Sequence, residues 1–378
     1  MRSSYQYIIQ GAGASGLWLA YWLDQFGLLQ NHHLLIAEGD LNKVNDRTWC
    51  FWTPIDEAEF PFVDKRWTSL RVQNANQVID PYAYCHTRSQ DFYGWVKIKL
   101  SQNPNIHWYK GYIEQAKASQ EYVEVQTAEG KLQAQYFFRS GQLTDFQGPD
   151  AISLWQSFVG WRIRLDQGTW DTKSATLMDF SIPQAHATRF LYVLPIAENE
   201  GLVEVTQFHA SPLTVAEGEE VLAEICKERG WKCSILEVEC NAIPMSSVFN
   251  QTEKVTQSNA RIIPIGVAAG ALKPTTGYGF LAMRKHAREL AIALKNKKPL
   301  PTIYRKRRFR FYDALLLHML SSTPHRGKAI FERLFSRQPA TRILKFLDEK
   351  TSIWEELRIF SRLQVSWFLK ALLTYGKD

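Results

Sequence analysis

Residues 5–16 read YQYIIQGAGASG, and this segment predicts more of the fold than any other part of the sequence. A short β-prone run is followed by glycines in the spacing G-x-G-x-x-G, at Gly11, Gly13 and Gly16. In this motif the first glycine permits a tight turn, the second lets the backbone approach a pyrophosphate, and the third lets a helix pack closely on its strand. The segment therefore predicts a dinucleotide-binding turn.

The residues after the turn complete a β–α–β unit. Apolar residues recur with helical spacing from Ala14 onward, and a second apolar run at 33–38 ends at Glu38, 22 residues after Gly16. The N–H groups at the start of the helix, where Ala14 lies, can hold phosphates. A carboxylate at the position of Glu38 can accept hydrogen bonds from ribose hydroxyls, so we expect both residues at the cofactor.

A second glycine-rich turn lies near the other end of the chain. The buried-strand pattern of 261–266 leads through Gly266 and Gly270 to the segment PTTGYG at 274–279, and a helical pattern follows. A nucleotide-binding unit at the start of a chain, paired with a late turn of this kind, is typical of FAD enzymes. We therefore expect Gly266, Gly270 and Gly277 on the flavin side. The alternative is a glycine-containing loop that binds no ligand.

The remaining patterns predict how the chain is divided. Residues 45–62 look irregular, 105–139 alternate like an antiparallel meander, 158–211 are rich in strands, and the chain is helical after Pro301. We expect an α/β fold with a Rossmann-type FAD-binding domain, an antiparallel β-sheet substrate domain and a helical C-terminal segment. The expected ranges are 1–68, 86–150 and 245–300 for the FAD-binding domain, 69–85 and 151–244 for the substrate domain, and 301–378 for the helical, membrane-facing segment.

Composition and charge narrow the classes of ligand. Lys and Arg number 45 against 38 Asp and Glu, and this excess fits anionic cofactors or anionic lipid surfaces. RNP motifs, zinc-finger spacing and basic zippers are absent from the sequence, so we expect neither nucleic acid nor a metal site. Five cysteines without a C-x-x-C pair fit a reducing compartment. Since we see neither a bilayer-spanning apolar stretch nor space for a signal peptide before the first strand, we expect a cytoplasmic protein.

Three segments resemble the flavoprotein lycopene cyclases. They are NDRTWCFW at 45–52, LVEVT at 202–206, and the stretch 265–278, which contains KPTTGY. The segments FYDALLL at 311–317 and FLDE at 346–349 are also similar to that family. The resemblance covers almost the whole chain.

The resemblance implies that the chain closes the ψ-ends of lycopene and other acyclic carotenoids into β-rings, giving γ-carotene and β-carotene. The family requires reduced FAD, with NADPH or NADH as reductant, although substrate and product are isomers. The reduced flavin is expected to stabilise a carbocation or take part in proton transfer. The acidic residue of the family maps onto Glu204. Further cofactor contacts are implied at Arg47, Thr276, Gly277 and Tyr278. For Arg47, the alternative is a surface ion pair with Asp46.

The chemistry makes demands that Glu204 can meet. Protonating an alkene to a tertiary carbocation needs a strong acid in a dry pocket, and a carboxylic acid buried among apolar groups keeps its proton. In a strand, Glu204 would share one face with Leu202 and Thr206. The alternative is a solvated strand residue on the open face of an antiparallel sheet. Aromatic faces also stabilise cations, and the candidates for this role are Trp49, Phe51, Trp52 and Tyr278.

Two segments depart from the family pattern. Residues 137–142 read FFRSGQ where the family has an Asp-x-Arg-Gly-like strand end on the cofactor side. Residues 271–272 are Ala-Leu where a bulkier pair containing Trp is expected. These changes bear on flavin contacts and substrate length, so a product with one ring or an altered substrate stays open.

The substrate also implies a membrane, because a long polyene must be drawn from a bilayer. The basic run 305–310 precedes an apolar helix, and Trp354, Trp367 and Phe368 can add contact, so we expect peripheral association. The alternative is a solvated basic helix that packs on its neighbours.

Two other functions remain open. One is an FAD-dependent oxidoreductase acting on an apolar substrate, such as a prenyl reductase or a monooxygenase, and the other is a non-catalytic lipid carrier. The acidic segment around Glu204 favours the cyclase over the oxidoreductase. The intact glycine turn with Glu38 disfavours the carrier, which can dispense with cofactor contacts.

Overall fold

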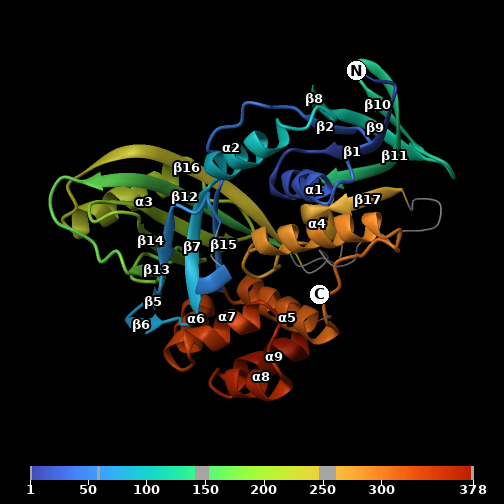
Figure 1. Cartoon of the computed structure of the whole chain (residues 1–378). Coiled ribbons are helices and arrows are strands. Elements are labelled where there is room, and N and C mark those ends of the chain that lie inside the picture. Colours follow the sequence, from blue (N-terminus) through green and yellow to red (C-terminus); the bar gives the residue numbers. More distant parts are fainter. Residues whose placement is uncertain (1, 58–59, 141–152, 247–260, 376–378) are drawn as a thin grey trace.

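The computed structural model describes residues 2–57, 60–140, 153–246 and 261–375. Within these ranges the strands form two seven-stranded sheets and one three-stranded sheet. Figure 1 shows the two large sheets beside each other, with the helices of the C-terminal quarter below them.

The first large sheet contains the β–α–β unit that the sequence predicts. Its strands are β1 (Ser4–Gln10), β2 (Leu34–Glu38), β8 (Ile106–Lys110), β9 (Ile113–Ala118), β10 (Val123–Thr127), β11 (Gly130–Ser140) and β17 (Ile262–Ile265). Their order is β8-β2-β1-β11-β10-β9, and β17 pairs with β11. Strands β8, β2, β1, β11 and β17 are parallel, and only β9, β10 and β11 form an antiparallel meander. The meander expected over 105–139 is thus correct from β9 onward, because β8 pairs with β2 instead.

Three helices form an aromatic core on this sheet, namely α1 (Ala14–Gln25), α2 (Ser89–Leu100) and α4 (Phe280–Lys295). Trp18 of α1 joins them, because its ring lies 5.0 Å from that of Phe92 and 5.9 Å from that of Phe280. Helices α1 and α4, which are far apart in the sequence, therefore pack together (Figure 1).

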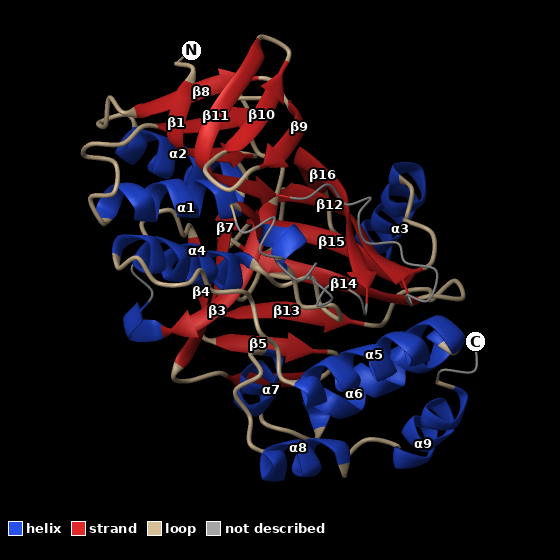
Figure 2. Ribbon diagram, turned by 90° about the vertical axis from the view of Figure 1, so that its right-hand side faces the viewer, coloured by secondary structure: helices blue, strands red, loops and turns tan. Residues whose placement is uncertain are grey.

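The second large sheet is mostly antiparallel. Its strands are β5 (Ser69–Val72), β6 (Ala75–Val78), β12 (Ser153–Leu165), β13 (Ser174–Asp179), β14 (Thr188–Pro195), β15 (Glu200–His209) and β16 (Cys233–Ser246). Their order is β16-β12-β15-β14-β13-β5-β6 (Figure 2). The pairing predicted for 190–195 and 201–208 is confirmed as β14 and β15. Strand β16 was not predicted from the sequence.

Both faces of β15 are covered. Helix α3 (Val215–Glu228) packs on one face, where Val203 and Val205 belong to its apolar cluster. Leu202 and Phe208 lie on the other face, in a cluster shared with the C-terminal helices. A residue in the middle of this strand is therefore enclosed whichever way it points.

The third sheet links the two large ones. It consists of β3 (Thr48–Pro54), β4 (Lys65–Trp67) and β7 (Tyr82–Arg88), in the order β3-β7-β4. The expectation of irregular structure over 45–62 is therefore wrong for 48–54, because Thr48–Pro54 pairs along its whole length with β7. Long-range pairing of this kind leaves little trace in a local pattern.

The chain after Pro301 is helical, as predicted. Its helices are α5 (Arg307–Ser322), α6 (Gly327–Ser336), α7 (Ala340–Leu347), α8 (Ile353–Phe360) and α9 (Val365–Thr374). In the described ranges, none of the helices has the length and apolar character needed to cross a bilayer.

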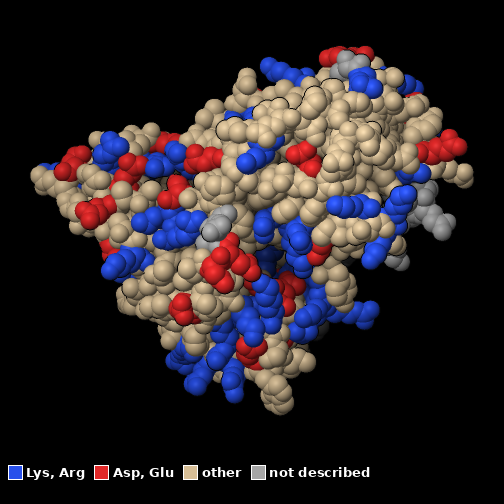
Figure 3. All heavy atoms as spheres, in the orientation of Figure 1, with Lys and Arg blue, Asp and Glu red and all other residues tan. Residues whose placement is uncertain are grey.

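Basic side chains gather on the C-terminal helices (Figure 3). Within the run 305–310, however, Arg305 is buried and Arg308 binds the Glu356 carboxylate at 3.0 Å. Lys306, Arg307 and Arg310 are exposed. The run is therefore divided between the interior and the surface.

Candidate active site

The glycine turn between β1 and α1 has the geometry of a pyrophosphate cradle. Gly11 has a φ of +95°, a conformation that glycine adopts readily. A Cβ on Gly13 would meet no atom within 4 Å, whereas a Cβ on Gly16 would collide with the Gly11 carbonyl oxygen. Gly13 thus faces open space and Gly16 serves close packing, which are the two roles expected from the spacing. Ala14 begins α1 directly behind this space.

Glu38 lies beside the same turn, at the end of β2. Its Oε2 accepts hydrogen bonds from the Ala12 N–H at 2.8 Å and from Lys43 Nζ at 2.7 Å. Burial favours the neutral acid, but the hydrogen bonds from Lys43 and Ala12 outweigh it and lower the pKa of Glu38. The group is therefore an ionised acceptor, as a ribose-binding carboxylate must be. The sequence analysis did not identify Lys43.

The late glycine turn meets the first one. Gly266 has a φ of +62°, and a Cβ there would collide with Ser15 Oγ at the start of α1. The hydroxyl oxygens of Ser15 and Thr276 are buried, and no described residue hydrogen-bonds either of them. Gly270 and Gly277 also adopt positive φ angles. The late turn thus contacts the start of α1 at Gly266, and each turn carries a buried hydroxyl that no described residue binds, as a polar ligand would require.

The end of β11, where the sequence departs from the family pattern, contacts the chain just before the first glycine turn. The hydroxyl of Ser140 donates to the Gln10 carbonyl oxygen at 2.6 Å. The next two residues of the segment, 141 and 142, lie outside the described ranges.

Arg47 lies in the loop before β3. Its guanidinium side chain is 51% exposed and lies 3.9 Å from the Asp46 carboxylate. The Asp46 carboxylate accepts a hydrogen bond from the Tyr93 hydroxyl at 3.1 Å, and the backbone of Arg47 is bound to Ser89. The loop is therefore held in place through its backbone and Asp46, while the Arg47 guanidinium remains accessible to an anion.

Glu204 is buried in the middle of β15, with only 9% of its surface exposed. Its Oε1 accepts a hydrogen bond from Thr206 Oγ1 at 2.9 Å, so the two residues share one face as expected. Burial, and then the neighbouring Glu239 carboxyl, raise the pKa of Glu204 well above its ordinary value. The solvated alternative does not hold, because both faces of the strand are covered. The structure thus presents an enclosed carboxylic acid that holds its proton more tightly than an exposed one.

Neutral hydroxyl and thiol groups surround this acid. The hydroxyls of Tyr84 and Tyr278 are hydrogen-bonded at 2.8 Å, and Tyr192 pairs directly with Glu204 across β14 and β15. Burial raises the pKa values of Tyr84, Tyr192 and Tyr278 above their ordinary value, and that of Cys50 as well. Of these four, the sequence analysis found only Tyr278. Cys50 and Tyr84 lie on β3 and β7, whose pairing was not predicted, and Tyr192 lies on the predicted strand β14 but belongs to no recognised motif.

The aromatic residues of β3 divide between its two faces. Trp52 points to the acid side, where its ring lies 4.8 Å from that of Tyr278. Trp49 and Phe51 alternate to the other face and stack on Phe280, at 5.0 and 5.2 Å. The structure therefore brings Trp52 and Tyr278 to Glu204, and places Trp49 and Phe51 in the core beneath the nucleotide-binding unit.

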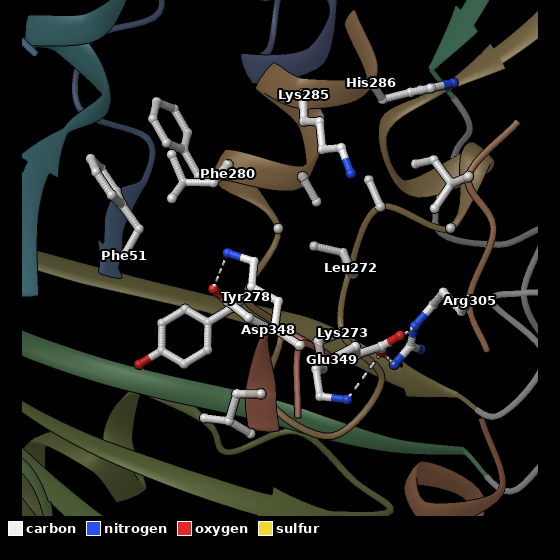
Figure 4. A pocket seen from close by; sticks show the side chains of 18 of the residues that line it. Phe51, Leu272, Lys273, Tyr278, Phe280, Lys285, His286, Arg305, Asp348 and Glu349 are labelled. Carbon is white, nitrogen blue, oxygen red and sulfur yellow. Dashed lines mark hydrogen bonds and ion pairs between the residues drawn. The ribbon is translucent and has the colours of Figure 1, made fainter. Parts of the chain in front are cut away.

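A cavity of about 340 Å³ lies between the late turn and the C-terminal helices. Phe51, Trp52 and Tyr278 line it, together with Ala271 and Leu272, the small pair that departs from the family pattern. Figure 4 shows the ion cluster of Lys273, Arg305 and Glu349 at the edge of the cavity, away from Phe51. The space joins the aromatic residues next to Glu204 to the helical segment.

The ion cluster fastens the late turn to the C-terminal helices. The Asp313 carboxylate on α5 binds Lys273 Nζ at 2.8 Å, the Thr275 hydroxyl at 3.0 Å and the Arg305 guanidinium. Burial opposes ionisation, but the two cations outweigh it and lower the pKa of Asp313. Glu349 binds both cations as well. The segments FYDALLL and FLDE thus supply carboxylates that hold the turn in place.

Comparisons with known proteins show the family of the chain. The family model described as lycopene cyclase protein matches residues 7–373. Over 222 residues the chain is 27% identical to a lycopene beta-cyclase from a Paracoccus species, covering 54% of this chain and 55% of that protein. Over 290 residues it is 23% identical to a lycopene beta-cyclase from Pantoea ananas, covering 74% of this chain and 72% of that protein. The match thus spans little more than half the length of the Paracoccus relative.

Solved structures share the fold at low identity. A geranylgeranyl bacteriochlorophyll reductase-like protein from Thermoplasma acidophilum has a TM-score of 0.62 at 11% identity, over 97% of this chain and 98% of that chain. A flavoprotein/dehydrogenase from Cytophaga hutchinsonii has a TM-score of 0.61 at 12% identity, over 99% and 100%. These likenesses confirm the predicted α/β flavoprotein fold with its antiparallel sheet and helical C-terminal segment.

Proposed function

The chain belongs to the lycopene cyclase family, and we propose that it is a lycopene beta-cyclase acting on lycopene and other acyclic carotenoids. A proton adds to the terminal alkene of a ψ-end, the resulting tertiary carbocation closes the ring, and loss of a proton from a neighbouring carbon leaves a β-ring. Substrate and product are isomers, so the carotenoid gains and loses no electrons. Cyclisation of one end gives γ-carotene and of both ends β-carotene.

The buried Glu204 is the observation that carries this proposal. An alkene is a very weak base, so the acid that protonates it must be kept neutral and away from water. Glu204 meets both conditions, because its strand is covered on both faces and its pKa is raised by burial. We assign it the role of general acid, with Thr206 orienting the carboxyl through the 2.9 Å hydrogen bond.

The two glycine turns fit FAD as the cofactor. Gly13 faces open space in front of Ala14, Ser15 contacts Gly266 of the late turn, and no described residue hydrogen-bonds the hydroxyls of Ser15 and Thr276. We propose that the α1 N-terminus holds the pyrophosphate and that Glu38 holds the ribose hydroxyls. Bound reduced FAD supplies an electron-rich ring system that stabilises nearby positive charge, and NADPH or NADH would keep it reduced.

Aromatic side chains complete the substrate site. The ring of Trp52 meets that of Tyr278 edge to face beside Glu204, and such rings attract a carbocation through their electron-rich faces. Tyr84 hydrogen-bonds Tyr278 and so holds this ring in position. Because these hydroxyls stay neutral, they place no competing charge near the acid.

The C-terminal helices are proposed to contact the bilayer that supplies the carotenoid. Helices α8 and α9 expose Trp354 at 77%, Leu357 at 53% and Leu373 at 71%. Apolar side chains on a helix beside basic residues favour an interfacial position on anionic lipid. Trp367 is partly buried, and the guanidinium of Arg326 lies over its ring at 5.0 Å.

Product analysis tests the proposal. The purified protein is incubated under reducing conditions with lycopene, FAD and NADPH, and the carotenoids are separated by chromatography. We expect γ-carotene and β-carotene from the wild type and unchanged lycopene from Glu204→Gln. Normal cyclisation by Glu204→Gln would remove this residue from the mechanism.

The same assay separates the cyclase from the other two functions. A flavin oxidoreductase would change the mass of the carotenoid by hydrogen or oxygen, whereas cyclisation leaves the mass unchanged. A lipid carrier would bind lycopene and return it unaltered. In lycopene-producing bacteria, only the cyclase is expected to turn red cells orange-yellow.

A further inference from the structure

Glu204 has a second carboxyl beside it, on a strand that is not its direct neighbour. Strand β12 lies between β15 and β16, and Gly160 of β12 pairs with Glu204 on one side and with Glu239 on the other. Residues paired across a sheet point to the same face. The two glutamates therefore project from the same face, one on each side of a glycine.

Gly160 allows the two side chains to approach each other. A Cβ on Gly160 would lie 3.2 Å from Glu204 Cβ and 3.2 Å from Glu239 Cγ. Backbones on either side of a central strand are about 9–10 Å apart, so the carboxyls can meet only if both side chains lean across that strand. They do so here, because the Glu204 and Glu239 carboxyls are within hydrogen-bonding contact.

Each carboxyl is held by a hydroxyl from a different element. Thr206 donates to Glu204 Oε1 at 2.9 Å, and Thr48 of β3 donates to Glu239 Oε2 at 2.6 Å. The other oxygen of Glu239, Oε1, is buried, and it accepts no hydrogen bond from an N–H group or a hydroxyl of the described residues. An unpaired buried carboxylate oxygen is costly unless it meets a proton. The neighbouring acid can supply that proton.

We propose that Glu204 and Glu239 share one proton and that Glu239 is the positioning residue that keeps it available to Glu204. The inference rests on the proposed function, in which Glu204 is the acid. Two carboxyls in contact cannot both ionise at low cost, so one proton stays between them, as in other carboxyl pairs. The proton leaves the pair as the new C–H bond forms. The ring carbocation then releases one proton, so the reaction consumes no net proton.

The other groups around the pair do not replace Glu239 in this role. Tyr192, Tyr278 and Cys50 face Glu204 from β14, the late turn and β3, and burial raises the pKa of each.

Beyond Glu239 lies a cavity of about 20 Å³, close to the volume of one water molecule. The charged groups that line it have their own partners, at 2.6 Å for His86 with Asp64, 3.0 Å for Arg88 with Asp91, 2.6 Å for Arg162 with Glu200 and 2.7 Å for Glu237 with Asn45.

The pH dependence of cyclisation tests the proposal in Glu239→Gln. Without the second carboxyl, Glu204 loses a neighbour that raises its pKa, so the alkaline loss of activity should move to lower pH. Glu237→Gln is the matched control, since Glu237 lies two residues away on the same strand and binds Asn45. This control should keep the wild-type profile. Glu239→Asp retains a carboxyl, so its pH profile should lie closer to that of the wild type than the profile of Glu239→Gln does.

Infrared difference spectroscopy of the purified protein gives a second measurement that needs no turnover. A shared proton should appear near neutral pH as a protonated-carboxyl band that both Glu204→Gln and Glu239→Gln alter and Glu237→Gln does not. An unchanged band and an unchanged pH profile in Glu239→Gln would overturn the shared proton while leaving the cyclase intact. A wild type that makes no cyclic product but shows the band would refute the proposed function and keep the carboxyl pair.

Discussion

Glu204→Gln should be increasingly stable relative to the wild type as the pH rises, although it removes the proposed acid. In the fold, the pKa of Glu204 is raised by burial and by Glu239. The folded carboxyl therefore keeps its proton above about pH 4.5, where the unfolded chain releases it. Unfolding then releases a proton, so wild-type stability falls as the pH rises until the folded pKa is passed. Glutamine carries no such proton and escapes this loss.

The size of the effect follows from the linkage between protons and folding. One proton more in the folded state costs about 1.4 kcal/mol of stability for each pH unit between the unfolded and the folded pKa. The amide can still accept from Thr206 and donate to Glu239, so the part of the change that does not depend on pH should be small. The slope against pH isolates the proton.

Urea denaturation between pH 5 and pH 8 measures this slope as the difference in free energy of unfolding between variant and wild type. Glu237→Gln serves as the control, because it leaves the buried acid in place and should show no such slope. A difference that is constant with pH would mean that Glu204 titrates alike in both states. A variant that becomes relatively less stable with rising pH would mean that Glu204 is ionised in the fold, and either result would refute the reasoning.

Three further outcomes are expected. Gly13→Val should fold, because no atom lies within 4 Å of a Cβ at this position, but its side chain should block the pyrophosphate and lower the flavin absorbance per chain. Full flavin content would contradict this. Gly16→Ala should instead disrupt folding, because its Cβ would collide with the Gly11 carbonyl oxygen. Asp313→Ala should cost about 3–5 kcal/mol in urea denaturation, because it leaves buried cations with less counter-charge, and a loss below about 1 kcal/mol would count against the ion cluster. Replacing exposed Trp354 and Leu373 by serine should weaken sedimentation with anionic vesicles without changing the circular dichroism spectrum, and equal binding would exclude this surface.

Local order was the part of the fold most open to prediction. The turn of Gly11, Gly13 and Gly16, the helix after it and the strand ending at Glu38 all use contacts between near neighbours in the chain. The amphipathic helices and the hairpin of β14 and β15 also follow from short-range periodicity. Strands β3 and β16 escaped prediction because their partners lie far away, and the strand sequence alone does not reveal them.

The candidate site shows the same division. Its acid and its glycines could be named from motifs, because each depends on residue type and spacing alone. Whether Glu204 would be buried depended on the C-terminal helices, which lie far along the chain and cover its face of β15. The meeting of Glu204 with Glu239 depended on a glycine in a third strand, and the alternation of β3 sent Trp52 to the acid but Trp49 to the core.

The sequence by itself thus determined the nucleotide-binding turn, the type of most elements and the identity of the acid. Tertiary structure alone decided the protonation of that acid, the partner it has and the inward direction of Arg305 and Arg308. The physical reason is that a pKa depends on desolvation and on nearby charge, and both arise only when segments distant in the chain are packed together.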